Sequence, residues 1–191
     1  MTYLAELDAI LSSTRADLAQ IKLIVFDVDG VLTNGQLYFS EQGESTKVFH
    51  VRDGVGLKLL SDMGVAVAVM TAKDSAMVRE RMTQLGVRHY FPGVADKSAL
   101  LTEVAGQLSV ALEHVGYVGD DMVDLKPISQ SGVSICPADA YGLVRDVADL
   151  VLPLSGGEGV ARLVCDLILQ AKGQFEQAYQ LSTMPEFERK R

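Results

Sequence analysis

The sequence has no long apolar run. Its longest continuous one, residues 65–70, has the length of a strand and is too short to cross a lipid bilayer, so we expect no membrane partner. The first 20 residues carry Glu6 and Asp8 early and have no basic leader. We therefore expect no signal peptide and a cytoplasmic protein.

Cysteine and positive charge are also scarce. Cys136 and Cys165 have apolar neighbours and lack the C-x-x-C spacing of a metal or redox motif, which predicts two buried free thiols in a reducing compartment. The 17 Lys and Arg residues are outnumbered by 25 Asp and Glu residues, which gives a net charge of −8. This balance argues against nucleic acid as a partner.

Strand-like and helix-like segments alternate along most of the chain. Strands are expected at 22–28, 65–70, 89–91, 115–118, 133–135 and 150–152. Helices are expected at 1–20, 54–63, 75–85, 97–108, 123–131, 141–147 and 159–179. The alternation predicts an α/β fold: one domain, residues 1–191, with a doubly wound parallel sheet and a C-terminal helix and tail over 155–191.

Residues 35–50 interrupt this alternation. Polar and apolar residues alternate around the segment SEQGES, a pattern typical of a β-hairpin. Its apolar residues are too many for an isolated, solvated ribbon: Leu37, Phe39, Val48 and Phe49. We therefore expect the hairpin to assemble the chain into a homo-oligomer.

Acidic and polar side chains follow successive expected strands. They are Asp27 and Asp29 in LIVFDVDGVLT, Thr71, Lys97, and Asp120, Asp121 and Asp124 in GDDMVD. The carboxyl ends of parallel strands share one edge of a sheet, so these side chains should converge there. Clustered carboxylates repel one another unless a hard cation lies among them, and their oxygens suit Mg²⁺.

With Mg²⁺ in place, this set fits phosphoryl transfer. Asp27 would be the nucleophile, and Asp29 would protonate the leaving oxygen and later activate water. Thr71 and Lys97 would donate to the phosphoryl oxygens. Each residue alone is more simply a cap or a loop residue. The order D-x-D, T, K and GDDxxD, each after its own strand, favours a catalytic site.

These motifs resemble the four motifs of the haloacid dehalogenase-like (HAD) phosphohydrolases, and the resemblance covers nearly the whole chain after the first helix. It implies a Rossmann-like, HAD-type fold in which Asp27 forms an aspartyl-phosphate. It also implies that Asp29 is the acid/base, that its backbone carbonyl joins Asp27 and Asp120 as a metal ligand, and that Asp121 and Asp124 orient that shell.

The gaps between the motifs leave no room for a cap domain. Together with the hairpin and HVRDGVGLKLL, this makes the chain similar to the 3-deoxy-D-manno-octulosonate 8-phosphate (KDO 8-phosphate) phosphatases of lipopolysaccharide sugar biosynthesis. That resemblance implies a homotetramer built on the hairpins, with a neighbour's tail at each active site. It also implies a set of substrate-binding residues: Asp29, His50, Val51, Arg52, Asp53, Gly54, Lys58, Lys73, Arg81 and Lys97.

Three positions depart from the family pattern. Lys73 replaces the usual Arg, Ala76 replaces a common Lys, and Glu158 reverses a charge in the segment GGEG. Lysine keeps the charge but lacks the planar fork that grips a carboxylate twice. The chain could instead serve a nine-carbon, sialic-type sugar-acid phosphate, or be a non-catalytic scaffold. A signalling receiver domain is disfavoured by the order of the motifs. In receivers the acidic pair comes first and the Lys last, whereas here the segment GDD follows Lys97.

Overall fold

A six-stranded sheet in the order β5-β4-β1-β6-β7-β8 forms the centre of the computed structural model, which describes residues 2–11 and 13–184. The strands are β1 (Leu23–Phe26), β4 (Ala66–Met70), β5 (His89–Phe91), β6 (Val115–Val118), β7 (Val133–Cys136) and β8 (Leu150–Val151). All of their pairings are parallel. The expected α/β parallel sheet is therefore confirmed.

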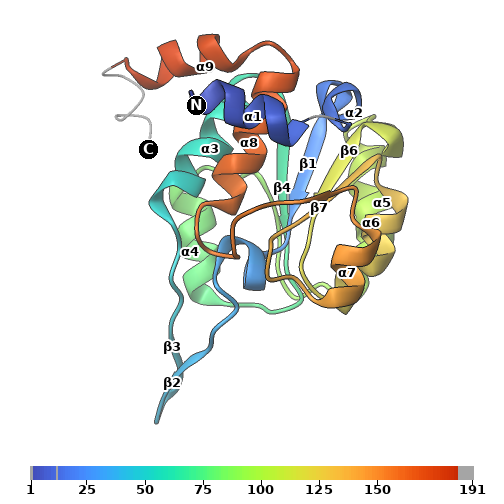
Figure 1. Ribbon diagram of the computed structural model, residues 1–191. Helices are drawn as coiled ribbons and strands as arrows, with labels where there is room; N and C mark the ends of the chain where they lie inside the picture. Colours follow the sequence, from blue (N-terminus) through green and yellow to red (C-terminus); the bar gives the residue numbers. More distant parts are fainter. Residues whose placement is uncertain (1, 12, 185–191) are drawn as a thin grey trace.

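Helices cover both faces of this sheet (Figure 1). They are α1 (Tyr3–Leu11), α2 (Arg15–Gln20), α3 (Val51–Asp62), α4 (Ala76–Gln84), α5 (Lys97–Gln107), α6 (Leu125–Gln130), α7 (Gly142–Val147), α8 (Val160–Ala171) and α9 (Phe175–Ser182). Along β1, Ile24 and Phe26 face the core beneath α3 and α8, whereas Leu23 and Val25 face the core beneath α5. Both faces of the strand are buried, which explains its unbroken apolar sequence.

The register of the central strands aligns their carboxyl ends. Phe26 of β1 pairs with Val69 of β4 on one side and with Val118 of β6 on the other. Asp27 continues this alignment, because its backbone N–H donates to the Val118 carbonyl over 2.9 Å. The residues that follow these three strands therefore meet at one edge.

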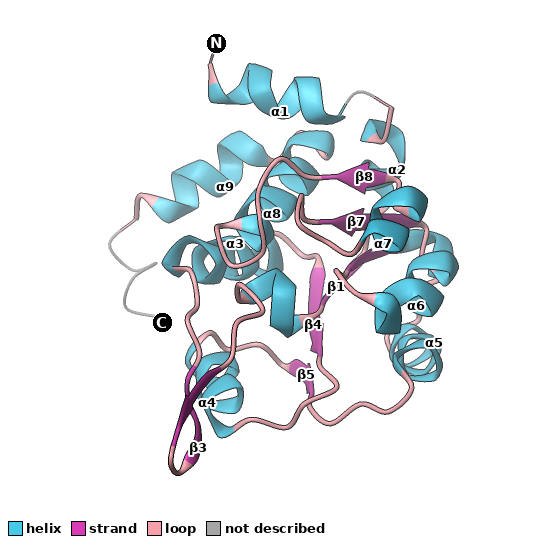
Figure 2. Cartoon of the chain, turned by 60° about the horizontal axis from the view of Figure 1, so that its bottom comes forward, coloured by secondary structure: helices cyan, strands magenta, loops and turns pink. Residues whose placement is uncertain are grey.

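The hairpin consists of β2 (Tyr38–Ser40) and β3 (Gly43–Thr46), which pair antiparallel and extend away from the sheet (Figures 1 and 2). The chain reaches it from β1 through a kinked turn, Val28–Leu32, in which Asp29 and Gly30 have non-helical backbone angles. No cap domain is inserted among the described residues. None of the helices in 2–11 and 13–184 combines the length and the apolar character needed to cross a membrane.

The predictions of one continuous helix over 1–20 and one over 159–179 are both wrong. Instead of one helix over 1–20, α1 ends at Leu11 and α2 begins at Arg15, and the Thr14 hydroxyl donates to the Leu11 carbonyl over 3.1 Å. Serine and threonine side chains compete with helical backbone bonds in this way. Instead of one helix over 159–179, α8 and α9 are separated by Gly173, whose φ of +67° ends the first helix.

The segment LSGGEGV, residues 154–160, includes the start of the predicted C-terminal helix and tail. It is instead an internal loop between β8 and α8. Gly157 donates its N–H to the Val31 carbonyl over 2.9 Å, and a Cβ on Gly156 would lie 1.9 Å from the Gly30 carbonyl oxygen. The loop thus packs on the turn after β1 of its own chain. The last part of the predicted tail, 185–191, lies outside the described residues.

Candidate active site

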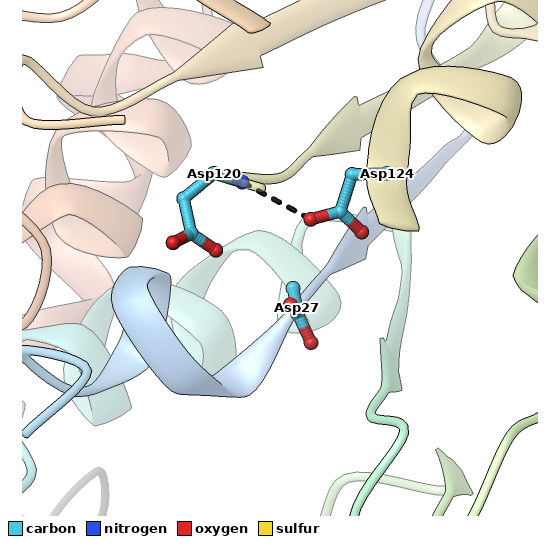
Figure 3. Close-up of side chains that lie close together, drawn as sticks. All are labelled: Asp27, Asp120 and Asp124. Atoms are coloured by element: carbon cyan, nitrogen blue, oxygen red, sulfur yellow. Dashed lines mark hydrogen bonds between the residues drawn. The ribbon is translucent and has the colours of Figure 1, made fainter. Parts of the chain in front are cut away.

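Three carboxylates converge at the carboxyl edge of the sheet (Figure 3). Asp27 follows β1, Asp120 follows β6, and Asp124 ends a short 3₁₀ turn, Met122–Asp124. Each residue offers an oxygen within 4.8 Å of the others. Gly30 makes room for this cluster, because a Cβ at its position would lie 2.0 Å from Asp120 Oδ2.

Lys97, the first residue of α5, carries the positive charge of the cluster. Its buried Nζ lies 2.8 Å from Asp27 Oδ2 and 2.7 Å from Asp124 Oδ1. Burial alone would lower the pKa of Lys97, but Asp27 and Asp124 together raise it. The ammonium therefore stays charged beside the predicted nucleophile, as a phosphoryl-binding group requires.

Both carboxylate oxygens of Asp124 accept hydrogen bonds from other groups of the protein. Its Oδ1 accepts from Tyr117 Oη over 2.7 Å as well as from Lys97. Its Oδ2 accepts from the backbone N–H groups of Asp120, over 3.1 Å, and Asp121, over 3.3 Å. Asp124 thus fixes the loop that carries Asp120 and orients Lys97, while the Asp121 carboxylate accepts from Met122 N at the start of the turn.

Asp120 is the unsatisfied member of the cluster. Its Oδ1 is buried without a hydrogen-bond partner among the described residues. Burial and the neighbouring Asp27 raise the pKa of Asp120 to about 8, and burial and Asp124 raise that of Asp27 to about 7. Two adjacent carboxyls with raised pKa values and a buried free oxygen fit a site for a hard cation such as Mg²⁺.

A hollow of about 260 Å³ opens beside these carboxylates. Thr71 lies in its wall, buried just after β4, with its Oγ1 accepting from the backbone N–H of Lys73 over 3.3 Å. The four predicted catalytic residues all line this hollow: Asp27, Asp29, Thr71 and Lys97. The structure brings them together as the motif order predicts.

The Asp29 side chain does not join the metal-like cluster. It forms an ion pair with Lys47, and its Oδ1 also lies 3.4 Å from Thr33 Oγ1. Only the backbone of Asp29 is left for the predicted metal contact. Lys47 was missed in the sequence, because a single lysine in the alternating pattern of a hairpin gives no signal of a role in a site.

The ten residues predicted to bind substrate do not all line the same hollow of one chain. Asp29, Lys73 and Lys97 line the hollow beside Asp27. Val51, Gly54, Lys58 and Arg81 line a separate cavity of about 280 Å³ at α3 and α4. Within one chain the predicted substrate residues therefore divide between separate hollows, and their role in substrate binding stays a prediction.

The remaining three have local structural contacts. Asp53 is buried and its Oδ1 accepts from the backbone N–H of Arg162 over 2.8 Å, so that it caps the start of α8. The His50 Nδ1 accepts from the backbone N–H of Arg52 over 3.2 Å and caps α3. The Arg52 side chain lines a third hollow, together with Glu158 and Arg162.

No family model matches the chain. The 3-deoxy-D-manno-octulosonate 8-phosphate phosphatase KdsC of Haemophilus influenzae is 43% identical over 157 residues, which cover 82% of this chain and 87% of that protein.

Solved structures that share the fold include two with a bound metal ion. The phosphatase of the same name from Moraxella catarrhalis, in complex with magnesium, phosphate and KDO, aligns with a TM-score of 0.86 and 35% identity over 91% of this chain and 99% of its own. The cobalt-bound form of the Haemophilus influenzae phosphatase aligns with a TM-score of 0.82 and 40% identity over 86% and 99%.

Proposed function

This chain belongs to the 3-deoxy-D-manno-octulosonate 8-phosphate phosphatase family of HAD-like phosphohydrolases, and on that premise we propose that it hydrolyses KDO 8-phosphate to KDO and phosphate with Mg²⁺. The observation that carries the proposal is the cluster of Asp27, Asp120 and Lys97. In it the buried Lys97 ammonium faces the Asp27 carboxylate, beside an Asp120 oxygen that has no hydrogen-bond partner within residues 2–11 and 13–184.

Mg²⁺ would be held by the Asp27 and Asp120 carboxylates and the Asp29 backbone carbonyl, where it would offset their repulsion and polarise the phosphoryl group. In the first step an Asp27 oxygen attacks phosphorus and the bond to the sugar oxygen breaks. Asp29 gives its proton to that leaving oxygen. Lys97 and Thr71 donate to the phosphoryl oxygens as negative charge spreads over them.

The second step returns the enzyme to its starting state. Asp29, now ionised, takes a proton from water, and the water oxygen attacks phosphorus of the aspartyl-phosphate. The bond between phosphorus and the Asp27 oxygen breaks, which releases inorganic phosphate. Throughout, Asp124 and Tyr117 keep Lys97 and the Asp120 loop in position.

The sugar acid would be recognised by Lys73, which lines the same hollow and whose ammonium can attract a carboxylate. The alternatives are a nine-carbon sugar-acid phosphatase and a non-catalytic scaffold. A complete set of acidic, hydroxyl and ammonium groups in one hollow favours an enzyme over a scaffold.

One substrate panel tests the proposal. Inorganic phosphate release is measured from KDO 8-phosphate, a nine-carbon sugar-acid phosphate and glucose 6-phosphate, with Mg²⁺ and with EDTA. We expect the highest kcat/KM for KDO 8-phosphate and no turnover in EDTA. Preference for the nine-carbon acid would change the substrate, whereas inactivity on all three with Mg²⁺ would contradict the proposed enzyme.

We also infer a homotetramer assembled through the hairpin. Leu37 is 54% exposed, Phe39 67% and Val48 51%, a large apolar surface for a two-stranded ribbon. A neighbouring copy would cover it and could bring residues 50–54, Lys58 and Arg81 towards another chain's hollow. Mixing an Asp27→Asn variant with an Arg52→Ala variant tests this, because shared sites would restore activity in the mixed oligomer.

The compartment proposed for this reaction is the cytoplasm. Cys136 and Cys165 are both free and buried. Burial raises the pKa of each thiol above its ordinary value, so neither is poised for exchange. Two unreactive free thiols are compatible with a reducing environment.

A further inference from the structure

Lys47, on the return arm of the hairpin just after β3, bridges two carboxylates. Its Nζ forms an ion pair with Asp29 Oδ1 and lies 3.2 Å from Glu44 Oε1. The Lys47 side chain is only 1% exposed, whereas that of Asp29 is 33% exposed. A lysine rarely becomes this buried unless its charge is paired, so the contact fixes the ammonium in one place.

Both side-chain donors to Asp29 engage the same oxygen. Thr33 Oγ1 lies 3.4 Å from Oδ1, the oxygen that also meets Lys47. Within the described residues, neither of these donors engages Asp29 Oδ2, so this oxygen is available for proton transfer. A partly exposed aspartate on this kinked turn would otherwise be free to rotate. A proton donor is effective only at hydrogen-bonding distance from the leaving oxygen.

We propose that Lys47 is a positioning residue for the acid/base Asp29, and that the hairpin thereby sets the orientation of that carboxylate. The inference rests on the proposed function, since it requires Asp29 to transfer the proton. Lys47 contacts the Asp29 carboxylate and is not among the residues that line the hollow beside Asp27, so it would act through Asp29.

Glu44 extends the same arrangement to the substrate side. Its other oxygen, Oε2, forms an ion pair with Lys73, and Lys73 followed by Lys47 lowers the pKa of Glu44. The charge of Glu44 offsets part of the positive charge that Lys47 places next to Asp29. One hairpin glutamate therefore links the residue that orients Asp29 with the residue expected to face the substrate carboxylate.

A comparison of leaving groups tests the role of Lys47. The sugar alkoxide of KDO 8-phosphate needs a proton to leave, whereas p-nitrophenolate leaves without one. Lys47→Met should lower kcat/KM for KDO 8-phosphate by roughly tenfold to a hundredfold, and that for p-nitrophenyl phosphate by less than about threefold. Lys47→Arg, which keeps the charge and the donors, should recover most of the loss.

Lys22→Met is the matched control, because Lys22 is exposed at the opposite end of β1 from Asp27. It should leave both substrates unaffected. Thermal unfolding verifies that each variant is folded, and Lys47→Gln replaces Lys47→Met if the latter is not.

Equal losses for the two substrates would assign Lys47 a structural role only, and no loss for either would remove it from the mechanism. Both outcomes overturn the inference while leaving the proposed function intact. Failure of the function itself would instead be recognised in the unmodified protein, as inactivity on KDO 8-phosphate with Mg²⁺.

Discussion

The Lys97 ammonium lies 2.8 Å from the Asp27 carboxylate, with both side chains almost completely buried. Such a pair is costly to desolvate and is weak evidence of stabilisation by itself. It is better understood as a catalytic arrangement, because the positive charge is placed where a phosphoryl group would meet its nucleophile.

Asp27→Asn should abolish turnover while the fold is retained, because an amide is a poor nucleophile and carries no charge for Mg²⁺. Phosphate release from KDO 8-phosphate measures the effect, with the exposed-site variant Asp17→Asn as control. Residual activity within roughly tenfold of the unmodified protein, about 1.4 kcal/mol of barrier, would contradict the assignment of the nucleophile.

Asp29→Asn should lower kcat for KDO 8-phosphate by roughly 10²- to 10⁴-fold, the range expected when an acid/base group is lost. Steady-state kinetics at saturating Mg²⁺ separates this from loss of the cation. Unchanged kcat would show that another group transfers the proton.

The stabilisation by Mg²⁺ should depend on pH. Without a cation, burial and neighbouring carboxylates raise the pKa of Asp120 to about 8 and that of Asp27 to about 7, from ordinary values of 3.8. The folded chain then binds more protons than the unfolded one, so the contribution of these groups to stability falls as pH rises from about 4 to about 8.

Because Mg²⁺ binds the ionised carboxylates, its effect should grow over the same interval. The rise in Tm on replacing EDTA with Mg²⁺ should be larger at about pH 8.5 than at about pH 6. Asp120→Asn should reduce the rise at the higher pH. An equal rise at both values would indicate that these two carboxyls do not hold the cation.

Phe39→Ser should dissociate the proposed tetramer, since Phe39 is the most exposed large apolar residue of the hairpin strands, at 67%. Light scattering should give a mass well above the 20.6 kDa of one chain for the unmodified protein, and a lower mass for the variant. Leu143→Ser, at an exposed position of α7, serves as control. An unmodified protein that is already monomeric at micromolar concentration would refute hairpin-mediated assembly.

Lys73→Arg should raise kcat/KM for KDO 8-phosphate more than for glucose 6-phosphate, because an arginine fork can bind the substrate carboxylate twice. One added charge-assisted hydrogen bond corresponds to about 1 kcal/mol, or roughly fivefold. Parallel kinetics on the two substrates measures the difference. Equal changes would mean that residue 73 does not distinguish the carboxylate.

The order of the motifs sufficed to predict the sheet and the meeting of Asp27, Thr71, Lys97 and Asp120. The apolar run of β1 ends at Asp27, and that of β6 is followed by Asp120, so parallel pairing alone brings the two together. Strand identity is local in the sequence and the edge rule is general, so no side-chain detail was needed. The same reasoning predicted the hairpin from its alternating residues and its turn.

Side-chain direction was decided only by the tertiary structure. Asp29 and Asp124 are both acidic and both lie near Asp27 in space, yet Asp29 turns to Lys47 on the hairpin and Asp124 is enclosed by Lys97 and Tyr117. These partners come from distant segments whose paths depend on packing rather than on periodicity. The sequence by itself determined which groups meet at the edge of the sheet. The folded chain determined that Asp124 is enclosed by donors, that Asp29 pairs with Lys47, and that Asp120 keeps an oxygen without a partner among the described residues.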